Sequence, residues 1–446
     1  VYNRTTSKMD GFIEERASDK DVKPTYSLEE LVDSLSKPRK VMLMVKAGRP
    51  VDIVIDNLIP HLEEGDIIID GGNSHFKDTE RRYEKLKERG IRYIGTGISG
   101  GEYGALHGPS IMPGGDEDAY AEVDDIFTDV AAQTEDGPCV THLGPKSAGH
   151  YVKMVHNGIE YGVMALLSEI YDIMRKVLDL EPAEMSKYFR EWNQEHQSYL
   201  IEITYEILER KDEETGKPLI EVILDRAKQK GTGKWSAQDA LDLGIPIPTI
   251  NAAVNARSLS ALKDERLKIG EEFGGLNEEA IEKIEETPEF MKALEDALYA
   301  GIVIAYAEGM KLLQAASDEY DYNLDLSDTA RIWEDGCIIR SSLLKPIQEA
   351  YKEEDELINL IMSTQFKDIM KEKVKGLREV AGKAKEIGIP IPALNSALDY
   401  FDIIRAKEAP ANLIQGQRDY FGAHTYQRRD KEGTFHTEWQ DIHNIE

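Results

Sequence analysis

Residues 147–178 read SAGHYVKMVHNGIEYGVMALLSEIYDIMRKVL and mark the point at which the chain changes character. The stretch contains no proline, and its helical periodicity predicts one long helix. From Ser147 onward helical patterns dominate and strand-like runs fade. We therefore expect a domain boundary near residue 146, with an all-helical part after it.

Before this boundary, short apolar runs alternate with amphipathic segments. Strands are expected at residues 41–45 (VMLMV), 66–70 (DIIID) and 91–94 (IRYI), with helices between them, such as residues 50–62 and 78–89. Alternating strands and helices predict a parallel α/β sheet. The opening residues VYNRT are typical of the end of a strand.

The helical part contains an internal repeat. Residues 243–248 (LGIPIP) recur as residues 387–392 (IGIPIP), an offset of 144. Residues 158–167 can be laid on residues 301–310 at an offset of 143. Together these matches predict a duplicated helical unit, with chance recurrence of a proline-rich turn as the alternative. After Arg405 the chain becomes polar and irregular, but it is too aromatic for a disordered tail and is expected to pack on a partner subunit.

Charge and composition exclude several classes of protein. The 446 residues include 84 acidic and 54 basic side chains, a formal net charge of −30. Such a surface repels nucleic acid and anionic membranes, and no apolar run reaches the ~18–20 residues of a membrane span. With only two cysteines, neither a disulfide framework nor a cysteine-rich metal site is expected. We expect a reduced, cytoplasmic protein of at least two domains.

One polar stripe on the long helix is a candidate catalytic face. Its members have spacings of 0, 3, 4 and 7, which places them on one side of a helix: Lys153, His156, Asn157 and Glu160. Their neighbours are largely apolar, so burial of the stripe would be costly unless it binds something. A solvated face is the alternative. At the offset of 143 the second copy carries Asp296, Tyr299, Ala300 and Val303 at these positions, which suggests that the fold itself does not need the polar set.

Two glycine-containing stretches are candidate anion sites. Residues 95–100 (GTGISG) match the dinucleotide pattern G-x-G-x-x-G, but further glycines and a proline follow where a helix should begin. We therefore expect a loop whose backbone amides beside Ser99 hold a carboxylate or phosphate. Residues 228–235 (KQKGTGKW) cluster lysines with small residues, although Trp235 breaks the P-loop pattern. Plain surface turns are the alternative for both stretches.

The first strand fragment bears on the choice of nucleotide. In a nucleotide-binding sheet this strand end meets the adenosine ribose, where an acidic residue suits a free 2′-hydroxyl and an arginine suits a 2′-phosphate. Arg4 has no Asp or Glu beside it, which favours NADP.

Five motifs together resemble the 6-phosphogluconate dehydrogenase family, and the resemblance runs essentially from Val1 to the C-terminus. They are DGGNS at 70–74, GISGGE at 97–102, KMVHNGIEY at 153–161, KGTGKW at 230–235 and QRDYFGAHT at 417–425. The resemblance implies NADP-dependent oxidation at C3 of 6-phosphogluconate, followed by loss of CO2 to give ribulose 5-phosphate. It implies no metal, because the 3-keto acid is its own electron sink once its carbonyl is polarised.

The resemblance also implies roles for individual residues. Lys153 would be the general base, with a pKa lowered by burial or positive neighbours, and Glu160 would be the acid. The substrate carboxylate and hydroxyls would be held by Asn73, Ser99, Gly100, Gly101, His156 and Asn157. The substrate phosphate would be held by Tyr161, Lys230, Thr232 and Arg257, with Arg418 and His424 from the other subunit of a homodimer. NADP would be held by Asn3, Arg4 and Thr5 at its 2′-phosphate and by Val45, Lys46 and Asn73 near the nicotinamide.

The expected fold is therefore a Rossmann-like α/β domain followed by a large all-α domain with a duplicated unit and a C-terminal tail. We expect an NADP-binding domain at 1–146, a helical substrate and dimerisation domain at 147–424, and a tail at 425–446 that packs on the partner. The family has a first strand and a Gly-rich phosphate loop before the position of Asn3. Their absence from this sequence predicts an incomplete cofactor domain with poor NADP binding. A small loop difference is expected at residues 192–198.

Two other functions remain open from the residues alone. One is another β-hydroxyacid dehydrogenase acting on a smaller acid without phosphate, against which the basic turn at 228–235 and the repeat argue. The other is an inactive, truncated helical dimer, against which the complete set from Lys153 to Glu160 argues.

Overall fold

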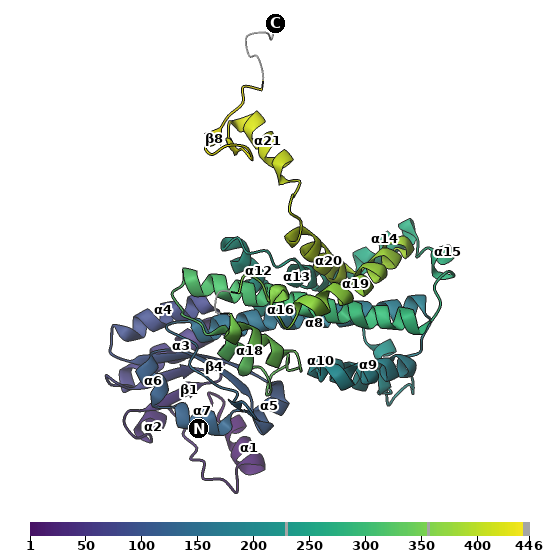
Figure 1. The fold of residues 1–446 in the computed structure, drawn as a ribbon. Helices are drawn as coiled ribbons and strands as arrows, with labels where there is room; N and C mark the ends of the chain where they lie inside the picture. Colours follow the sequence, from purple (N-terminus) through teal and green to yellow (C-terminus); the bar gives the residue numbers. More distant parts are fainter. Residues whose placement is uncertain (228–230, 355–356, 440–446) are drawn as a thin grey trace. The chain divides into compact units, whose positions relative to one another are not determined.

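A computed structural model describes residues 1–227, 231–354 and 357–439 (Figure 1). The chain forms two compact units, Val1–Leu398 and Asp399–Glu446, and each is described on its own.

A four-stranded sheet organises the first part of the larger unit. Its strands, in spatial order, are β1 (Lys40–Leu43), β2 (Ile67–Asp70), β3 (Arg92–Ser99) and β4 (Ser110–Gly115). The first three are parallel, which confirms the predicted strands and the parallel sheet, and Tyr2 adds an isolated parallel bridge to Thr25. The antiparallel β4 was not predicted; the sequence pattern holds no run that separates it from a loop.

Helices cover the sheet because both of its faces are apolar. The helices of this part of the chain are α1 (Thr6–Arg16), α2 (Leu28–Asp33), α3 (Arg49–Leu58), η1 (Ile59–His61), α4 (Phe76–Lys87), α5 (Gly101–His107), α6 (Glu117–Ala121) and α7 (Asp124–Val130). Those that pack on the sheet are α2, α3, α4, α6 and α7. Alternate residues of β2 enter different cores: Ile68 packs in the cluster with α2, α3 and α4, while Ile67 and Ile69 pack in the cluster with α6 and α7. A two-stranded ribbon, β5 (Gln133–Thr134) with β6 (Gly137–Pro138), follows.

The prediction of a loop at residues 95–100 is wrong. Residues 95–99 continue β3, and α5 begins directly afterwards at Gly101. The glycines serve close packing: a methyl group added at Gly95 would lie 2.6 Å from Thr79 Cγ2, and one at Gly97 would lie 2.3 Å from Cβ of Lys153. These positions therefore need glycine because Thr79 and Lys153, from distant helices, pack directly on the strand, and not because the chain turns there.

The rest of the larger unit is helical, and it begins with the predicted long helix, α8 (Ala148–Val177). The other elements are α9 (Pro182–His196), α10 (Tyr199–Glu209), α11 (Leu219–Val222), α12 (Thr232–Asp242), α13 (Pro248–Ser260), α14 (Lys263–Phe273), α15 (Glu278–Ile281), α16 (Pro288–Glu319), α17 (Leu326–Arg331), α18 (Leu344–Glu353), η2 (Leu360–Met362), α19 (Lys367–Ile387) and α20 (Pro392–Ile404). The division between the two units falls within α20, after Leu398. The two longest helices, α8 and α16, pack side by side (Figure 1).

The duplication is confirmed by a pair of equivalent helix caps. Each repeated proline-rich turn starts a helix, α13 at Pro248 and α20 at Pro392. The carboxylate of Glu308 on α16 accepts the first amides of α13, from Thr249 and Ile250, at 3.0 and 3.1 Å. The carboxyl group of Glu169 on α8 likewise accepts the first amides of α20, from Ala393 and Leu394, at 2.7 and 2.8 Å. The oxygens of a carboxyl group are favourable at a helix N-terminus because they pair with unsatisfied amides. Burial raises the pKa of Glu169 and of Glu308 to about 8, and the hydrogen bonds from the amides oppose this rise.

These caps correct the alignment of the two long helices. Glu308 lies 139 positions after Glu169, not 143, a difference of about one helical turn. A methyl group at Gly162 would lie 3.3 Å from Cβ of Ala305, and one at Gly301 would lie 2.7 Å from Leu166, which is the same contact with the copies exchanged. The offset of 139 relates both pairs.

The corrected alignment changes what the second copy says about the polar stripe. The residues that match Lys153, His156, Asn157 and Glu160 are Lys292, Glu295, Asp296 and Tyr299. The assignment of Asp296, Tyr299, Ala300 and Val303 to these positions is therefore wrong, and so is the inference that the second copy lacks the polar set. In that copy the charges neutralise one another: Lys292 pairs with Glu295 at 2.8 Å and with Asp296 at 3.0 Å, and Lys373 of α19 pairs with Asp296 at 2.7 Å.

The smaller unit is folded around one buried carboxylate. It holds α21 (Ala411–Gly422) and a ribbon of β7 (Tyr426–Gln427) with β8 (Thr434–Phe435). Asp419 is fully buried and accepts hydrogen bonds from His436, the Thr437 amide and the Trp439 indole at 2.8–3.0 Å. These bonds confirm that the described part of the tail is ordered.

Candidate active site

The candidate base lies where α8 crosses the sheet. Cβ of Lys153 packs on Gly97 of β3, and the lysine is only 6% exposed. Burial lowers the pKa of its ammonium group to about 8, although the negative charge of Glu160 opposes the change. A lysine in this state supplies a neutral amine near physiological pH.

A buried histidine lies beside this lysine. Nδ1 of His156 is 3.3 Å from Nζ of Lys153 and 3.1 Å from Oδ1 of Asn157, and its Nε2 is 3.2 Å from the hydroxyl of Ser99. Burial holds the pKa of His156 well below its usual value, so the ring is neutral. Lys153, His156 and Asn157 thus share one face of α8, as the spacing predicted, and Ser99 of β3 lies beside that face.

Glu160 lies on the same face, one turn beyond His156. Its side chain is 20% exposed, and a carboxylate oxygen is 4.0 Å from Nδ1 of His156. Burial raises the pKa of this carboxyl group, while Lys153 and Arg257 lower it. Lysine and glutamate therefore shift in the directions that suit a base and an acid on one surface.

A cationic subsite adjoins Glu160. The guanidinium of Arg257, on α13, lies 3.6 Å from the centre of the Tyr161 ring. Thr232 is the first residue of α12 and is buried, and a methyl group at the next residue, Gly233, would lie 2.5 Å from the Tyr161 ring. These predicted phosphate ligands share one region, whereas Lys230 lies outside the described residues.

The junction between β3 and α5, at Ser99–Gly101, faces a segment that the sequence analysis missed. A methyl group at Gly100 would lie 2.5 Å from the carbonyl oxygen of Gly336, and the Ile338 amide is 3.4 Å from the Ser99 hydroxyl. Trp333 from the same segment meets the His156 ring edge-on, with ring centroids 5.6 Å apart. No local signal marks these residues, since they are far from α8 in sequence.

The predicted nicotinamide-end residues lie on the loops after β1 and β2. Asn73 and Lys46 are exposed, and a methyl group at Gly72 would lie 3.1 Å from the carbonyl oxygen of Val45. The loop after β2 is held by Asp70, which accepts hydrogen bonds from the Gly72 amide and from other neighbours.

The predicted 2′-phosphate residues precede α1. Asn3, Arg4 and Thr5 are exposed, and Oδ1 of Asn3 accepts from the Thr5 amide at 2.9 Å. Thr5 caps α1 without a side-chain hydrogen bond, and the first turn of α1 holds no acidic residue.

Arg418 and His424 lie in the smaller unit, on and just after α21. Arg418 is exposed and its guanidinium is 3.1 Å from Gln415. Their part in the site stays a prediction.

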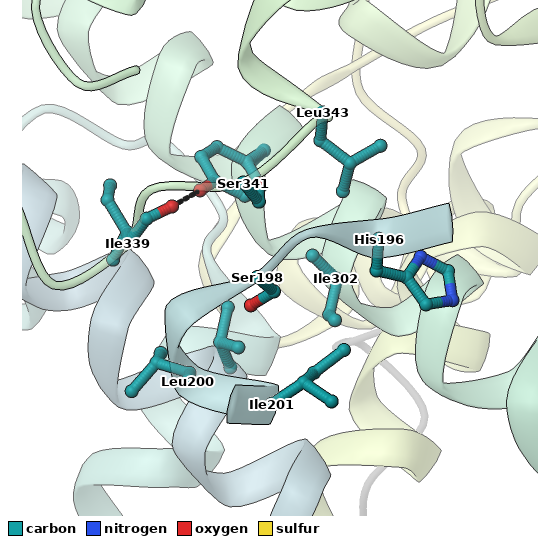
Figure 2. Close-up of a pocket in the computed structure, with 10 residues that line it drawn as sticks. His196, Ser198, Leu200, Ile201, Ile302, Ile339, Ser341 and Leu343 are labelled. Carbon is teal, nitrogen blue, oxygen red and sulfur yellow. Dashed lines mark hydrogen bonds between the residues drawn. The ribbon is translucent and has the colours of Figure 1, made fainter. Parts of the chain in front are cut away.

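An enclosed cavity elsewhere in the larger unit is not the candidate site. It measures about 10 Å³, room for one water molecule at most. Figure 2 shows mostly aliphatic side chains around it. They come from α8, α9, α10 and α16, from the turn between α9 and α10, and from the segment at 339–343. None of the predicted site residues lines it. Within the described residues no cluster of three or more His, Cys, Asp or Glu side chains could hold a metal ion. No described helix is long and apolar enough to cross a membrane.

Comparison with known proteins agrees with this geometry. One family model, the NAD binding domain of 6-phosphogluconate dehydrogenase, matches residues 1–144, and a second, the C-terminal domain of 6-phosphogluconate dehydrogenase, matches residues 149–439. Two Bacillus subtilis proteins cover nearly the whole chain. The NADP-dependent decarboxylating 6-phosphogluconate dehydrogenase is 52% identical over 98% of this chain and 93% of its own length. The NAD-dependent enzyme is 51% identical over 99% and 94%.

Among solved structures, the 6-phosphogluconate dehydrogenase of Plasmodium falciparum superposes with a TM-score of 0.94 at 44% identity. The match covers 98% of this chain and 94% of that one, which was solved in its apo form and with its cofactor NADP+ and substrate 6-phosphogluconate. The chain therefore belongs to the 6-phosphogluconate dehydrogenase family.

Proposed function

We propose that this chain oxidises and decarboxylates 6-phospho-D-gluconate with NADP, giving D-ribulose 5-phosphate, CO2 and NADPH, as a step of the pentose phosphate pathway. The observation that carries the proposal is the buried face of α8, where a lysine with a lowered pKa and a glutamate with a raised pKa lie on either side of a neutral histidine. Full-length similarity to decarboxylating enzymes supports the same reaction.

In the oxidation step, Lys153 is the general base. Its neutral amine takes the proton of the 3-hydroxyl group while C3 loses a hydride, which leaves a 3-keto acid. Bound NADP supplies the hydride acceptor. The buried surroundings favour this step because they keep a useful fraction of the lysine neutral.

In the second step the protonated Lys153 polarises the 3-keto oxygen. The C1–C2 bond of the keto acid breaks, CO2 leaves, and the electron pair passes to the oxygen on C3, which takes a proton from the lysine. Glu160 then protonates the resulting enediol on the carbon that becomes C1 of the product, while Lys153 takes back the proton of the hydroxyl group on the former C3, so that the 2-keto group of ribulose 5-phosphate forms. The raised pKa of Glu160 increases the fraction of this carboxyl group that carries a proton for the transfer.

The residues before α1 fit the 2′-phosphate of NADP. Arg4 forms no ion pair with any described residue. The Thr5 hydroxyl and the amides of Thr6 and Ser7, at the start of α1, are available as donors, whereas the Lys8 amide donates to the Thr5 carbonyl at 3.0 Å. We propose that Asn3, Arg4 and Thr5 hold the 2′-phosphate, with Val45, Lys46 and Asn73 near the nicotinamide. Identity alone does not select the coenzyme, because relatives named for NADP and NAD are almost equally similar.

The substrate ligands follow the two polar regions of the site. We propose that the carboxylate and hydroxyls contact Asn73, Ser99, Gly100, Gly101, His156 and Asn157. The phosphate contacts Tyr161, Lys230, Thr232 and Arg257. Support comes from the adjacency of Arg257, Tyr161 and Thr232 at the end of the Lys153 face.

We also propose a homodimer in which the tail completes the partner's site through Arg418 and His424. The domain division would then be 1–146, 147–424 and 425–446. Phe421 and Leu413 on α21 are 71% and 67% exposed in the single chain, as expected for a helix that packs on another subunit. Mixing Lys153→Ala and Arg418→Ala chains tests this arrangement. Hybrid dimers should regain one intact site and part of the activity, and no recovery despite subunit exchange would contradict it.

The reaction is tested by following NADPH absorbance and CO2 release with 6-phosphogluconate and, separately, with 3-hydroxyisobutyrate. We expect turnover of the phosphorylated acid, and Lys153→Ala should abolish it while substrate binding persists. Preference for the smaller acid would favour the other β-hydroxyacid dehydrogenases. A folded chain that binds neither NADP nor 6-phosphogluconate would favour a non-catalytic dimer.

A further inference from the structure

His150 occupies a buried position one helical turn before Lys153. It lies on α8, is 1% exposed, and reaches two segments of the cofactor domain. Its Nε2 lies 3.0 Å from the carbonyl oxygen of Gly72, and its Nδ1 lies 2.7 Å from the hydroxyl of Thr79 on α4. Neither the sequence motifs nor the proposed mechanism uses this histidine.

The two contacts select one form of the ring. A carbonyl oxygen only accepts hydrogen bonds, so Nε2 must carry a proton and donate it to Gly72. Burial lowers the pKa of His150, so the ring is neutral and Nδ1 is an acceptor. The Thr79 hydroxyl donates its single proton to Nδ1 at 2.7 Å, since its other possible acceptor, the His75 carbonyl, is farther away at 3.3 Å. The ring has little freedom to move, because a methyl group at Gly95 would lie 2.9 Å from Nδ1.

The carbonyl that His150 holds belongs to the loop that presents Asn73. On the other side of the same residue, the Gly72 amide donates to Asp70 at 3.1 Å. Asp70 is itself anchored by Ser74 at 2.7 Å and by Tyr93 at 3.0 Å. Gly72 is therefore held through both its amide and its carbonyl group, and Asn73 is the next residue.

We propose that His150 is a positioning residue for the reaction, which ties the catalytic helix to the Asn73 loop and so sets Asn73 relative to Lys153. The proposal rests on the proposed function, since it takes Asn73 to contact substrate and nicotinamide. Both ends of the tie are needed because Lys153 is placed by the contact of α8 with β3, whereas Asn73 is placed by the loop after β2. A displacement of about 1 Å between groups of this kind can cost up to ~100-fold in rate.

Two substitutions of His150 distinguish the effect of its hydrogen bond to the Gly72 carbonyl from the effect of its packing. In His150→Gln the amide nitrogen can still reach the Gly72 carbonyl, whereas in His150→Asn the shorter side chain keeps only the Thr79 contact. We expect kcat to fall about 10- to 100-fold in His150→Asn and less than about threefold in His150→Gln. KM should change less than kcat in both, and the pH at which Lys153 titrates should be unchanged. Equal loss in the two variants would overturn the proposal.

A matched control uses another histidine of the same part of the chain. Nε2 of His142 lies 3.0 Å from the carbonyl oxygen of Gly115, away from the site residues. His142→Asn removes a hydrogen bond of the same kind and should leave kcat at the wild-type value. If His150→Asn does not fold, Thr79→Val is the second variant. It removes the hydroxyl that fixes the tautomer, keeps the side-chain volume, and should lower kcat severalfold.

A double-mutant cycle with Asn73→Ala decides whether His150 acts through that residue. The double variant that combines Asn73→Ala with His150→Asn should have the same kcat as Asn73→Ala alone, within about twofold. The double variant that combines Asn73→Ala with Thr79→Val should give the same result. Losses that multiply would overturn the proposal and assign His150 a general structural role. If Asn73→Ala has wild-type kcat and KM, the proposal also fails, yet wild-type turnover of 6-phosphogluconate would leave the proposed function intact.

Discussion

The pH dependence of turnover tests the assignment of Lys153 as the base. A lysine with an ordinary pKa of 10.5 would be only about 0.03% neutral at pH 7, whereas a pKa of about 8 makes roughly 10% of it neutral. Burial thus supplies roughly 300-fold more of the reactive amine. Because the neutral form is required, activity must fall as the pH drops below the pKa.

The measurement is kcat/KM for 6-phosphogluconate between about pH 5.5 and 9.5 at constant ionic strength, which reports groups of the free enzyme. We expect a plateau above about pH 8 on this side of the profile and roughly a tenfold loss for each unit below it. The substrate phosphate also titrates, but near pH ~6, and this is far enough below 8 to be separated.

A substitution of Glu160 also predicts the direction in which the pH profile should shift. Its negative charge raises the pKa of Lys153, so Glu160→Gln should move the acidic limb to lower pH, measured on the residual activity. An acidic limb centred below about pH 6.5 in the wild type, or one that moves to higher pH in Glu160→Gln, would refute the reasoning.

Three further outcomes follow from the structure. Arg4→Glu should lower kcat/KM for NADP about 10- to 100-fold through loss of a charge-assisted hydrogen bond, with little change for NAD; equal losses would remove Arg4 from the 2′-phosphate site. Gly97→Ala would place a methyl group 2.3 Å from Cβ of Lys153, so we expect about 1–3 kcal/mol of destabilisation with a reduced kcat, and wild-type values of both would contradict the close packing. Glu308→Ala leaves two amides of α13 unpaired and should cost about 1–3 kcal/mol in urea unfolding, whereas Glu319→Ala at the exposed end of α16 should cost less than about 0.5 kcal/mol.

Much of the fold was predictable because it depends on local periodicity. The apolar runs at 41–45, 66–70 and 91–94 became the parallel strands, and the proline-free stretch at 147–178 became α8. The polar stripe of α8 was also predictable, since helical geometry alone places residues spaced by three and four positions on one face.

Other features could not be predicted from local patterns. The glycines at 95 and 97 resembled a loop, yet they continue β3 because α8 packs directly on them. The alignment of α8 with α16 was wrong by about one turn, since two long apolar helices match at several offsets and only the caps at Glu169 and Glu308 select one.

The sequence alone was enough to predict the succession of elements, the polar face of α8 and, through its motifs, the family. These are properties of neighbouring residues, which helix and strand periods arrange without help from the rest of the chain. Only the tertiary structure decided that Lys153 is buried on Gly97, that Trp333 packs against His156, and that His150 holds the Gly72 carbonyl. The reason is physical: the pKa of a lysine and the position of a loop depend on what surrounds them in space, and those surroundings come from segments distant along the chain.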